Sequence, residues 1–420
     1  MAAKKAQAES PKQVRVRMYR TGFGDCFLIT LGNGASARHV LIDFGAHARG
    51  ELGTMGAIMD DIEQVTGKEL LLLVATHQHR DHISGFGQFA ARFADFKIGE
   101  VWLPWMDNPD DAAAAALNEK QNALYSTLEN HLRLGLGAKE SDPRFAAALD
   151  ALSNLTGNEL AKSELQRGFG TGAKVRYLRA GDERSSVGAL AGFSAGILGP
   201  PADRQALGRM NPPADQRFLA APGDTSAAVR PFSKLEIRPR SCDYKAIVKD
   251  GQPVAPDAYL DALHEAAEVP ADRLALYLDS NRNNTSLVIL FRYKGKALLF
   301  PGDAQWGNWQ SWIGTARAKQ LLGEVDFFKV AHHGSENATP VDVVKALRDA
   351  GLFAMVPTQV MPFPTIPRMP LLEQLEKHCS DHVAVRSDFV EIPKAPGAPK
   401  PKPKLPKAFE SGEVWIDCSL

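Results

Sequence analysis

The chain is expected to fold as an α/β protein (α+β type), a four-layer αββα sandwich. Apolar and alternating segments gather in a β-rich half near each end of the chain, and both halves also carry helical segments. A content of 44% hydrophobic and 23% charged residues is typical of a globular protein. In chain order we expect a disordered N-terminus (1–12), the first half of the fold (13–106) and a partly helical insertion (107–276). The second half of the fold (277–392) follows, and then a Pro/Lys linker with a C-terminal strand (393–420).

The first half opens with residues 14–19, which alternate as a half-buried strand should. Gly22 to Gly24 marks a tight turn, and the continuous apolar run 70–75 indicates a central strand covered on both faces. The strands expected here are 14–19, 26–31, 40–44, 70–75 and 101–104. The expected helices are 55–65, ended by Gly67, and 84–93.

The expected insertion combines helical and irregular composition. Its predicted helices are 110–134, 143–155 and 159–165, and its predicted strands are 175–178 and 193–198. Residues 200–240 are rich in Pro, Ala and Arg and show no clear periodicity. Two interpretations of the insertion stay open: a lid over the functional site, or a solvated embellishment of the fold.

The second half repeats the mixture of strands and helices. A hairpin is predicted for 287–293 and 296–300 around Gly295, followed by a strand at 325–331, a helix at 340–350, a strand at 353–357, a helix at 369–378 and a strand at 383–388. Pro and Lys alternate over 394–407, which predicts an extended linker of polyproline type. Residues 413–417 are expected to dock as an edge strand.

Four potential metal ligands follow the apolar run 70–75: His77, His79, Asp81 and His82. In an extended segment His77 and His79 fall on the same side, and Asp81 and His82 lie where the chain turns. Without a cation between them, such groups would repel one another. Imidazole and carboxylate ligands suit zinc, and also manganese or iron. One such cluster can supply ligands to two metal ions, which lie roughly 3.5–4 Å apart in two-metal hydrolases.

These residues resemble a known family. His-x-His-x-Asp-His after a hydrophobic strand is the signature of the metallo-β-lactamase fold hydrolases. The further motifs are similar to the branch that contains the hydrolase domain of ComEC-type DNA-uptake proteins. They are Gly24–Ile29, Leu41–Gly45, Asn283–Val288, Leu298–Asp303, Lys329–Ser335 and Val383–Asp388. The matches cover about 1–105 and 275–390, in the expected order.

The resemblance implies roles for the later residues. Asp303 would bridge two divalent ions, with zinc expected and manganese or iron as alternatives. His333, which precedes a glycine, matches the family ligand; because adjacent side chains in a strand point oppositely, only one of His332 and His333 is expected to ligate. His332 is then catalytic or substrate-facing, and Asp81 also belongs to the catalytic set. The residues expected behind the ligands or facing the substrate are Asp43, Asn284, Ser286 and Ser335.

Two departures from the family pattern matter. Many members take another ligand from a histidine between the first cluster and the bridging aspartate, but only His131 and His264 lie in that interval, and neither follows a strand. One ion is therefore expected to be weakly held. The His-Pro that usually follows the last motifs is absent from 361–370, so Arg368 or His332 would have to supply a proton donor.

The motifs predict a metal-dependent hydrolase that uses a metal-bridging hydroxide, and the ComEC resemblance implies a phosphodiesterase or nuclease with nucleic acid as a possible substrate. Six arginines in the irregular region would neutralise phosphates if they face the metals: Arg204, Arg209, Arg217, Arg230, Arg238 and Arg240. One alternative is hydrolysis of a small ester, lactone or phosphocholine-like group in a pocket lined by tryptophans. Packing in the core and at interfaces is the favoured explanation of Trp102, Trp105, Trp306, Trp309 and Trp312. Another is a metal-stabilised binding module with little turnover.

Composition limits the partners and the compartment. The formal net charge is zero, so the binding of a polyanion would require a local patch of positive charge. There is no apolar run of the roughly 18–20 residues that cross a bilayer and no signal-peptide pattern, which predicts a cytoplasmic protein without a membrane partner. The four cysteines form no Cys-x-x-Cys pair and are expected to be reduced thiols, with Cys26 in the core. Protein partners and oligomeric state are not predicted.

Overall fold

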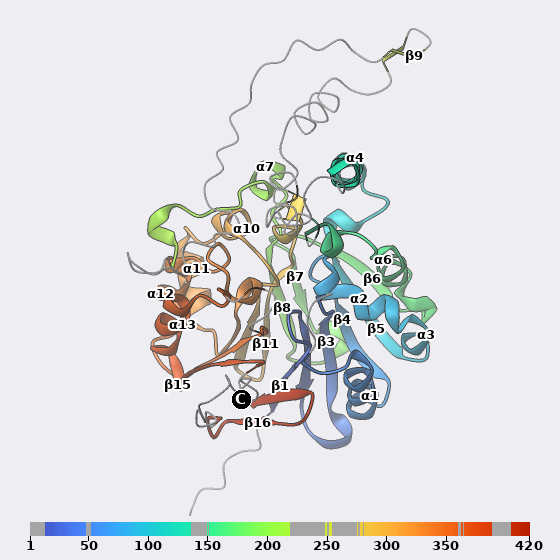
Figure 1. The fold of residues 1–420 in the computed structure, drawn as a ribbon. Coiled ribbons are helices and arrows are strands. Elements are labelled where there is room, and N and C mark those ends of the chain that lie inside the picture. Colours follow the sequence, from blue (N-terminus) through green and yellow to red (C-terminus); the bar gives the residue numbers. More distant parts are fainter. Residues whose placement is uncertain are drawn as a thin grey trace, which may run out of the picture.

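A computed structural model describes residues 13–47, 52–135, 149, 151–218, 248–249, 252–253, 275, 278–279, 281–359, 363, 365–388 and 405–420. Two mixed β-sheets face each other, and helices cover the outer side of each sheet (Figure 1). The predicted αββα class is therefore confirmed. None of the helices in the described part of the chain has the length and apolar character that a bilayer crossing requires.

The first sheet contains eight strands in the order β16-β17-β1-β2-β3-β4-β5-β6. Its strands are β1 Val14–Tyr19, β2 Cys26–Leu31, β3 Arg38–Phe44, β4 Glu69–Val74, β5 Lys97–Pro104, β6 Lys174–Leu178, β16 Phe409–Ser411 and β17 Trp415–Ser419. Strand β4 runs parallel to both of its neighbours. This central position explains its continuous apolar run, because both faces of β4 are covered.

The second sheet contains seven strands in the order β15-β14-β13-β12-β11-β8-β7. Its strands are β7 Glu183–Ser185, β8 Ser194–Gly199, β11 Val288–Tyr293, β12 Lys296–Phe300, β13 Phe327–Lys329, β14 Leu352–Val356 and β15 Cys379–Arg386. The predicted β11–β12 hairpin turns through Lys294 (φ 51°) and Gly295 (φ 76°). Two consecutive positive φ values are typical of the tight turns that join antiparallel strands. A separate pair, β9 Val248–Lys249 and β10 Gln252–Pro253, forms a small sheet.

Helices bury apolar stripes on both outer faces. The first sheet is covered by α1 Met55–Thr66, α2 Arg80–Gln88, α3 Ala90–Phe93 and α6 Glu159–Gln166. The second is covered by α10 Trp306–Gln310, α11 Ala316–Gly323, α12 Val341–Ala346 and α13 Met369–Glu376. The long α4 Ala112–Gly135 and the short α7 Arg204–Leu207 lie near the end of the sandwich where both sheets carry their loops (Figure 1). Helix α1 ends where predicted, because Gly67 adopts a left-handed φ of 59°.

The core between the sheets is strongly aromatic. Trp102 of β5 stacks on Phe291 of β11 with ring centroids 6.2 Å apart, and Phe27 meets Phe300 at 5.5 Å. All four rings are fully buried, and each contributes on the order of 1.5–3 kcal/mol through burial. Cys26 is buried as predicted.

Part of the interval expected to be an insertion belongs to the sandwich itself. Strand β6 forms the outer strand of the first sheet, whereas β7 and β8 extend the second sheet beside β11. Strands β6 and β8 were predicted individually, β7 was not predicted, and the membership of these strands in the two sheets was not predicted. The predicted edge strand near the C-terminus also differs, because β17 lies between β16 and β1 rather than outermost. Residues 1–12, most of the predicted helix 143–155 and the Pro/Lys segment lie outside the described residues.

Candidate metal centre

The candidate ligands converge at one edge of the sandwich, where strands from both sheets end. Strand β4 leads into His77 and His79, β12 leads into Asp303, and β13 leads into His333. Strands β3 and β4 are parallel to each other, as are β12 and β13, so their carboxyl ends meet at the same edge. All the predicted ligand side chains are buried there.

The helix after the cluster begins earlier than predicted. It was expected from 84, but α2 starts at Arg80, because His79 takes an extended conformation and the helix follows directly. Asp81 and His82 therefore occupy the first helical turn. A carboxylate in this position is favoured by the positive end of the helix dipole.

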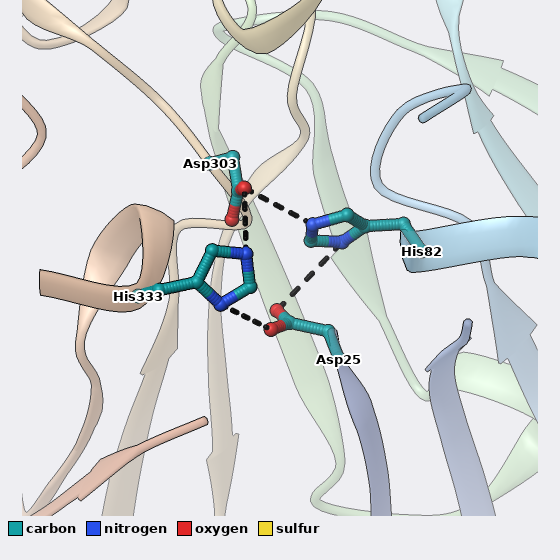
Figure 2. Close-up of side chains that lie close together, drawn as sticks. All are labelled: Asp25, His82, Asp303 and His333. Carbon is teal, nitrogen blue, oxygen red and sulfur yellow. Dashed lines mark ion pairs between the residues drawn. The ribbon is translucent and has the colours of Figure 1, made fainter. Parts of the chain in front are cut away.

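One group of nitrogen and oxygen atoms surrounds Oδ2 of Asp303. This atom lies 3.1 Å from Nε2 of His82 and 3.5 Å from Nε2 of His333, as the dashed lines in Figure 2 show. Asp81 adds Oδ2 at 3.3 Å from Nε2 of His333 and Oδ1 at 3.9 Å from Nε2 of His82. Bonds of about 2.0–2.1 Å around a tetrahedral ion place neighbouring ligand atoms about 3.3 Å apart. The group therefore has the spacing of a coordination shell.

A second pair of nitrogen atoms lies beside this group. Nε2 of His77 is 2.9 Å from Nδ1 of His79, and the rings of His77 and His82 are 4.1 Å apart. Nε2 of His79 lies 3.5 Å from Oδ1 of Asp279, on the opposite side of the ring from Nδ1. The side chains of His131 and His264 lie outside the described residues, so the expected weakness of one metal position stays a prediction.

Asp43 orients two of the candidate ligand histidines. Its Oδ2 accepts from Nδ1 of His82 at 2.8 Å and from the Thr76 hydroxyl at 2.7 Å, and its Oδ1 accepts from the Thr76 backbone N–H at 2.7 Å. Because the single hydroxyl proton of Thr76 goes to the carboxylate, Nδ1 of His77, 3.1 Å from that hydroxyl, must be the donor. Nε2 of His77 is then left without a proton, as metal ligation requires.

The two adjacent histidines both reach the site, but not through the alternation of a strand from which their different roles were predicted. Strand β13 ends at Lys329, and His332 (φ 43°) and His333 (φ 55°) lie in a tight turn instead of a strand. Two successive left-handed residues remove the alternation on which the prediction depended. Nε2 of His332 lies 3.9 Å from Oδ2 of Asp303, and Nδ1 of His333 donates to the Pro357 carbonyl at 2.8 Å, which leaves Nε2 of His333 facing the centre.

Burial and charge divide the histidines into two classes. Burial lowers the pKa of His77 well below its ordinary value, that of His79 to about 3, and that of His332 to about 4. Burial also disfavours charged His82 and His333, but the neighbouring carboxylates, led by Asp303, outweigh it and raise both pKa values above 6.5. In the metal-free protein these two rings therefore carry protons that metal ligands would have to release.

The residues fit divalent metal. Nε2 of His82 and Oδ1 of Asp81 are buried yet make no hydrogen bond within the described residues, although buried polar atoms are normally paired. Neutral imidazoles and carboxylates are the donors that zinc, manganese and iron accept. Together with the ligand-like spacing, this buried set points to divalent metal without selecting the element.

The metal-free protein is expected to lose stability, and divalent metal to bind more tightly, as the pH rises above about 6.5. The pKa values of His82 and His333 are raised on folding, so their protonated forms stabilise the fold at low pH and this contribution disappears as pH rises through the raised values. Because bound metal displaces both protons, affinity should rise by up to about 100-fold per pH unit. Unfolding midpoints with and without Mn²⁺ at several pH values measure this, and a metal-induced shift that shrinks with rising pH contradicts it.

Two charged residues of the site were missed. Asp25 and Lys329 are both buried, and Nζ of Lys329 lies 2.5 Å from Oδ2 of Asp25 and 3.1 Å from Oδ1 of Asp303. Figure 2 shows Asp25 on the side of the His82 and His333 rings opposite Asp303, 3.7 Å from each Nδ1. Because both Nδ1 atoms already donate elsewhere, Asp25 lies behind the ligands. A lysine in the apolar run 327–331 was the available signal for Lys329.

Two of the polar residues expected beside the site contact it. The Ser286 hydroxyl accepts from the Asp303 backbone N–H at 3.0 Å. The Ser335 hydroxyl lies 2.9 Å from Nδ1 of His332. These contacts hold Asp303 and His332 from behind.

Asn284 has a different role from the expected one. Its Nδ2 donates to the carbonyls of Leu207 and Arg209, and its Oδ1 accepts from the backbone N–H of Gln305. It therefore joins the segment after α7 to the loop after β12. No contact between Asn284 and a candidate ligand side chain occurs among the described residues.

Four members of the tryptophan and arginine groups named above make their described contacts away from the centre. Trp102 packs between the sheets, and Nε1 of Trp309 donates to the Ala304 carbonyl inside the outer core. The guanidinium of Arg209 donates a hydrogen bond to Oε1 of Gln310, and that of Arg217 donates one to the Pro212 carbonyl. The side chains of the other four arginines lie outside the described residues.

Arg368 was one of two candidates for the missing proton donor. Its guanidinium forms an ion pair with Glu336 beside the His332–Ser335 turn. This pairing occupies the guanidinium and leaves His332 as the more exposed alternative, with 20% of its side chain accessible.

Comparison with family models matches residues 19–110 to the metallo-beta-lactamase superfamily. The matched segment contains Asp43 and the complete Thr76–His82 cluster. Together with the buried histidine and aspartate group, this match indicates metal-dependent hydrolase chemistry. A search of curated proteins found no match to the chain. The likeness to ComEC-type hydrolases, carried mainly by residues after 275, stays a prediction.

Proposed function

We propose that the chain hydrolyses phosphodiesters with two divalent metal ions. The observation that carries the proposal is two neighbouring pairs of histidine nitrogens, Nε2 of His77 with Nδ1 of His79, and Nε2 of His82 with Nε2 of His333, the second of which lies against Oδ2 of Asp303. Two adjacent ions, when bound, activate a water molecule near neutral pH and stabilise the attacking and leaving oxygens of an in-line displacement. Such a pair of ions suits reaction at phosphorus, because the attacking and leaving oxygens lie on one line through the phosphorus atom.

A positive charge beside the cluster supports an anionic substrate. The guanidinium of Arg282 is 6% exposed and donates to Oε1 of Gln78 at 2.8 Å and to the Tyr125 hydroxyl at 3.1 Å. Both hydrogen-bond partners are neutral, and the nearby buried carboxylate of Asp107 feels the same charge, since Arg282 opposes the rise of its pKa. Its charge reaches the metal loop, since it contributes to lowering the pKa of His79.

His332 supports the proton-transfer part of the proposal. It is partly exposed, it lies against Asp303, and its low pKa leaves it neutral at pH 7. The Ser335 hydroxyl donates to Asn337, so Nδ1 of His332 donates to that hydroxyl and Nε2 is left unprotonated. A neutral imidazole in this state can act as a general base and accept a proton from a water molecule. Nucleic acid falls within the proposed substrate class, and activity on it should decrease with salt.

Metal content by plasma mass spectrometry, combined with two chromogenic substrates, tests the proposal. We expect about two ions per chain, turnover of bis-p-nitrophenyl phosphate above that of p-nitrophenyl acetate, and loss of turnover in Asp81→Ala. Arg282→Gln should raise KM for the phosphodiester and leave that for the acetate unchanged. Turnover of the acetate alone would favour a small-ester hydrolase, and bound metal without turnover of either substrate would favour a binding module.

A further inference from the structure

Lys329 is a buried ammonium group directly behind Asp303. It is 1% exposed, and its Nζ lies 2.8 Å from the Gly302 carbonyl, 3.1 Å from Oδ1 of Asp303 and 2.5 Å from Oδ2 of Asp25. Three acceptors match the three donors of an ammonium group. Burial disfavours the charge, but the two carboxylates outweigh burial and raise the pKa of Lys329, so the ammonium keeps its proton.

This contact makes the two oxygens of Asp303 unequal. Oδ1 is held by Lys329, whereas Oδ2 faces Nε2 of His82, His333 and His332 at 3.1, 3.5 and 3.9 Å. The carboxylate cannot turn to offer both oxygens to metal without breaking its bond to a buried cation. Breaking such a bond is costly, because the cation would be left partly unpaired.

Asp25 balances the charge that Lys329 brings. An uncompensated ammonium group beside the centre would oppose the binding of cations. Burial raises the pKa of Asp25, and the adjacent ammonium group opposes this rise. The backbone N–H of Asp25 also donates to the carbonyl of Asp81 at 2.8 Å, which fixes Asp25 to the metal loop.

We infer that Lys329 and Asp25 form a neutral positioning pair that holds Oδ1 of Asp303 and leaves Oδ2 as the single oxygen shared by two metal ions. This inference rests on the proposed two-metal function. Two ions that share one oxygen atom lie closer together than two ions bound to separate oxygens of a carboxylate. The pair therefore controls the separation of the ions, and through it the geometry offered to the substrate.

Titration with Mn²⁺ followed by electron paramagnetic resonance tests the inference without using turnover. Two ions joined by one oxygen atom lie closer together and give a more strongly exchange-coupled spectrum than two ions bound to separate oxygens of a carboxylate. We expect this spectrum for the wild type, and in Lys329→Met its loss together with binding of the second ion weakened by about 10- to 100-fold. Lys296→Met is the matched control, because Lys296 on the neighbouring strand pairs with Asp326 at 3.5 Å, away from Asp303.

Asp25→Asn separates orientation from charge and serves if Lys329→Met does not fold. An asparagine still accepts from Lys329 but leaves one more positive charge, so the coupled spectrum should remain while Mn²⁺ affinity falls at least about tenfold. Either of two results would overturn the inference and leave the proposed function standing. One is an unchanged Mn²⁺ affinity in Asp25→Asn, and the other is a spectrum of Lys329→Met that is coupled as in the wild type. Fewer than two ions in the wild type would overturn the inference and the proposed function together.

Discussion

Asp303→Ala is expected to reduce kcat/KM for a phosphodiester by on the order of 10³-fold or more, and to lower the metal content below two ions per chain. Oδ2 of Asp303 lies 3.1 Å from Nε2 of His82 and 3.5 Å from Nε2 of His333, two of the four candidate ligand histidines. Its removal would deprive both ions of a shared ligand. Metal charge stabilisation is worth several kcal/mol in a transition state, and about 1.4 kcal/mol corresponds to tenfold in rate.

Asp326→Ala provides the matched control for this substitution. Asp326 is also a buried, ion-paired aspartate next to β13, but it precedes the strand and bonds to Arg348 and to the backbone N–H of Ala297. We expect it to lower the unfolding midpoint and to leave the metal stoichiometry intact. If Asp303→Ala bound two ions and turned over substrate normally, Asp303 would not be part of the metal centre.

Gly45→Ala is expected to displace the metal loop by steric conflict alone. A Cβ atom at residue 45 would lie 2.3 Å from the carbonyl carbon of Asp81 and from the backbone nitrogen of His82. Both atoms belong to the backbone of the first turn of α2, so no flexible side chain can move aside. Overpacking of this kind costs about 1–3 kcal/mol or more. A shift of about 1 Å at the ligands can cost about 100-fold in rate.

Gly56→Ala is the control for Gly45→Ala. A Cβ atom at residue 56 would meet no atom within 4 Å, and Gly56 lies in α1. Alanine in a helix should raise the free energy of unfolding by about 0.5–1 kcal/mol. Thermal unfolding and metal analysis of both variants test the predicted displacement of the metal loop. Wild-type stability and wild-type metal content in Gly45→Ala would contradict the close packing of the loop.

The parts of the site that could be predicted are those encoded by nearby residues. His77, His79, Asp81 and His82 follow one strand, and their spacing alone indicates a shared site. Asp303 and His333 required the resemblance to a family, because nothing in their local composition distinguishes them from residues in ordinary turns. The structure brings all six together.

The residues that could not be predicted depend on contacts between distant segments. Asp25 and Lys329 meet because β2 begins, and β13 in the other sheet ends, at the same edge. The orientation of His332 depends on two left-handed residues in a turn, which no periodicity reveals. For the same reason β6 and β8 were recognisable as strands, whereas the sheet that each would join was not.

The place of β17 has a consequence for synthesis on the ribosome. Arg17 of β1 forms a bidentate pair with Asp417 of β17, at 2.7 Å through each nitrogen, across 400 positions of the chain. Strand β1 therefore lacks its outer partner until the ribosome has added the residues of β17, 400 positions later. Closing so long a loop is entropically unfavourable and slows folding. Nascent chains should expose the free edge of β1 to chaperones until β17 has emerged, although β1 can already pair with β2.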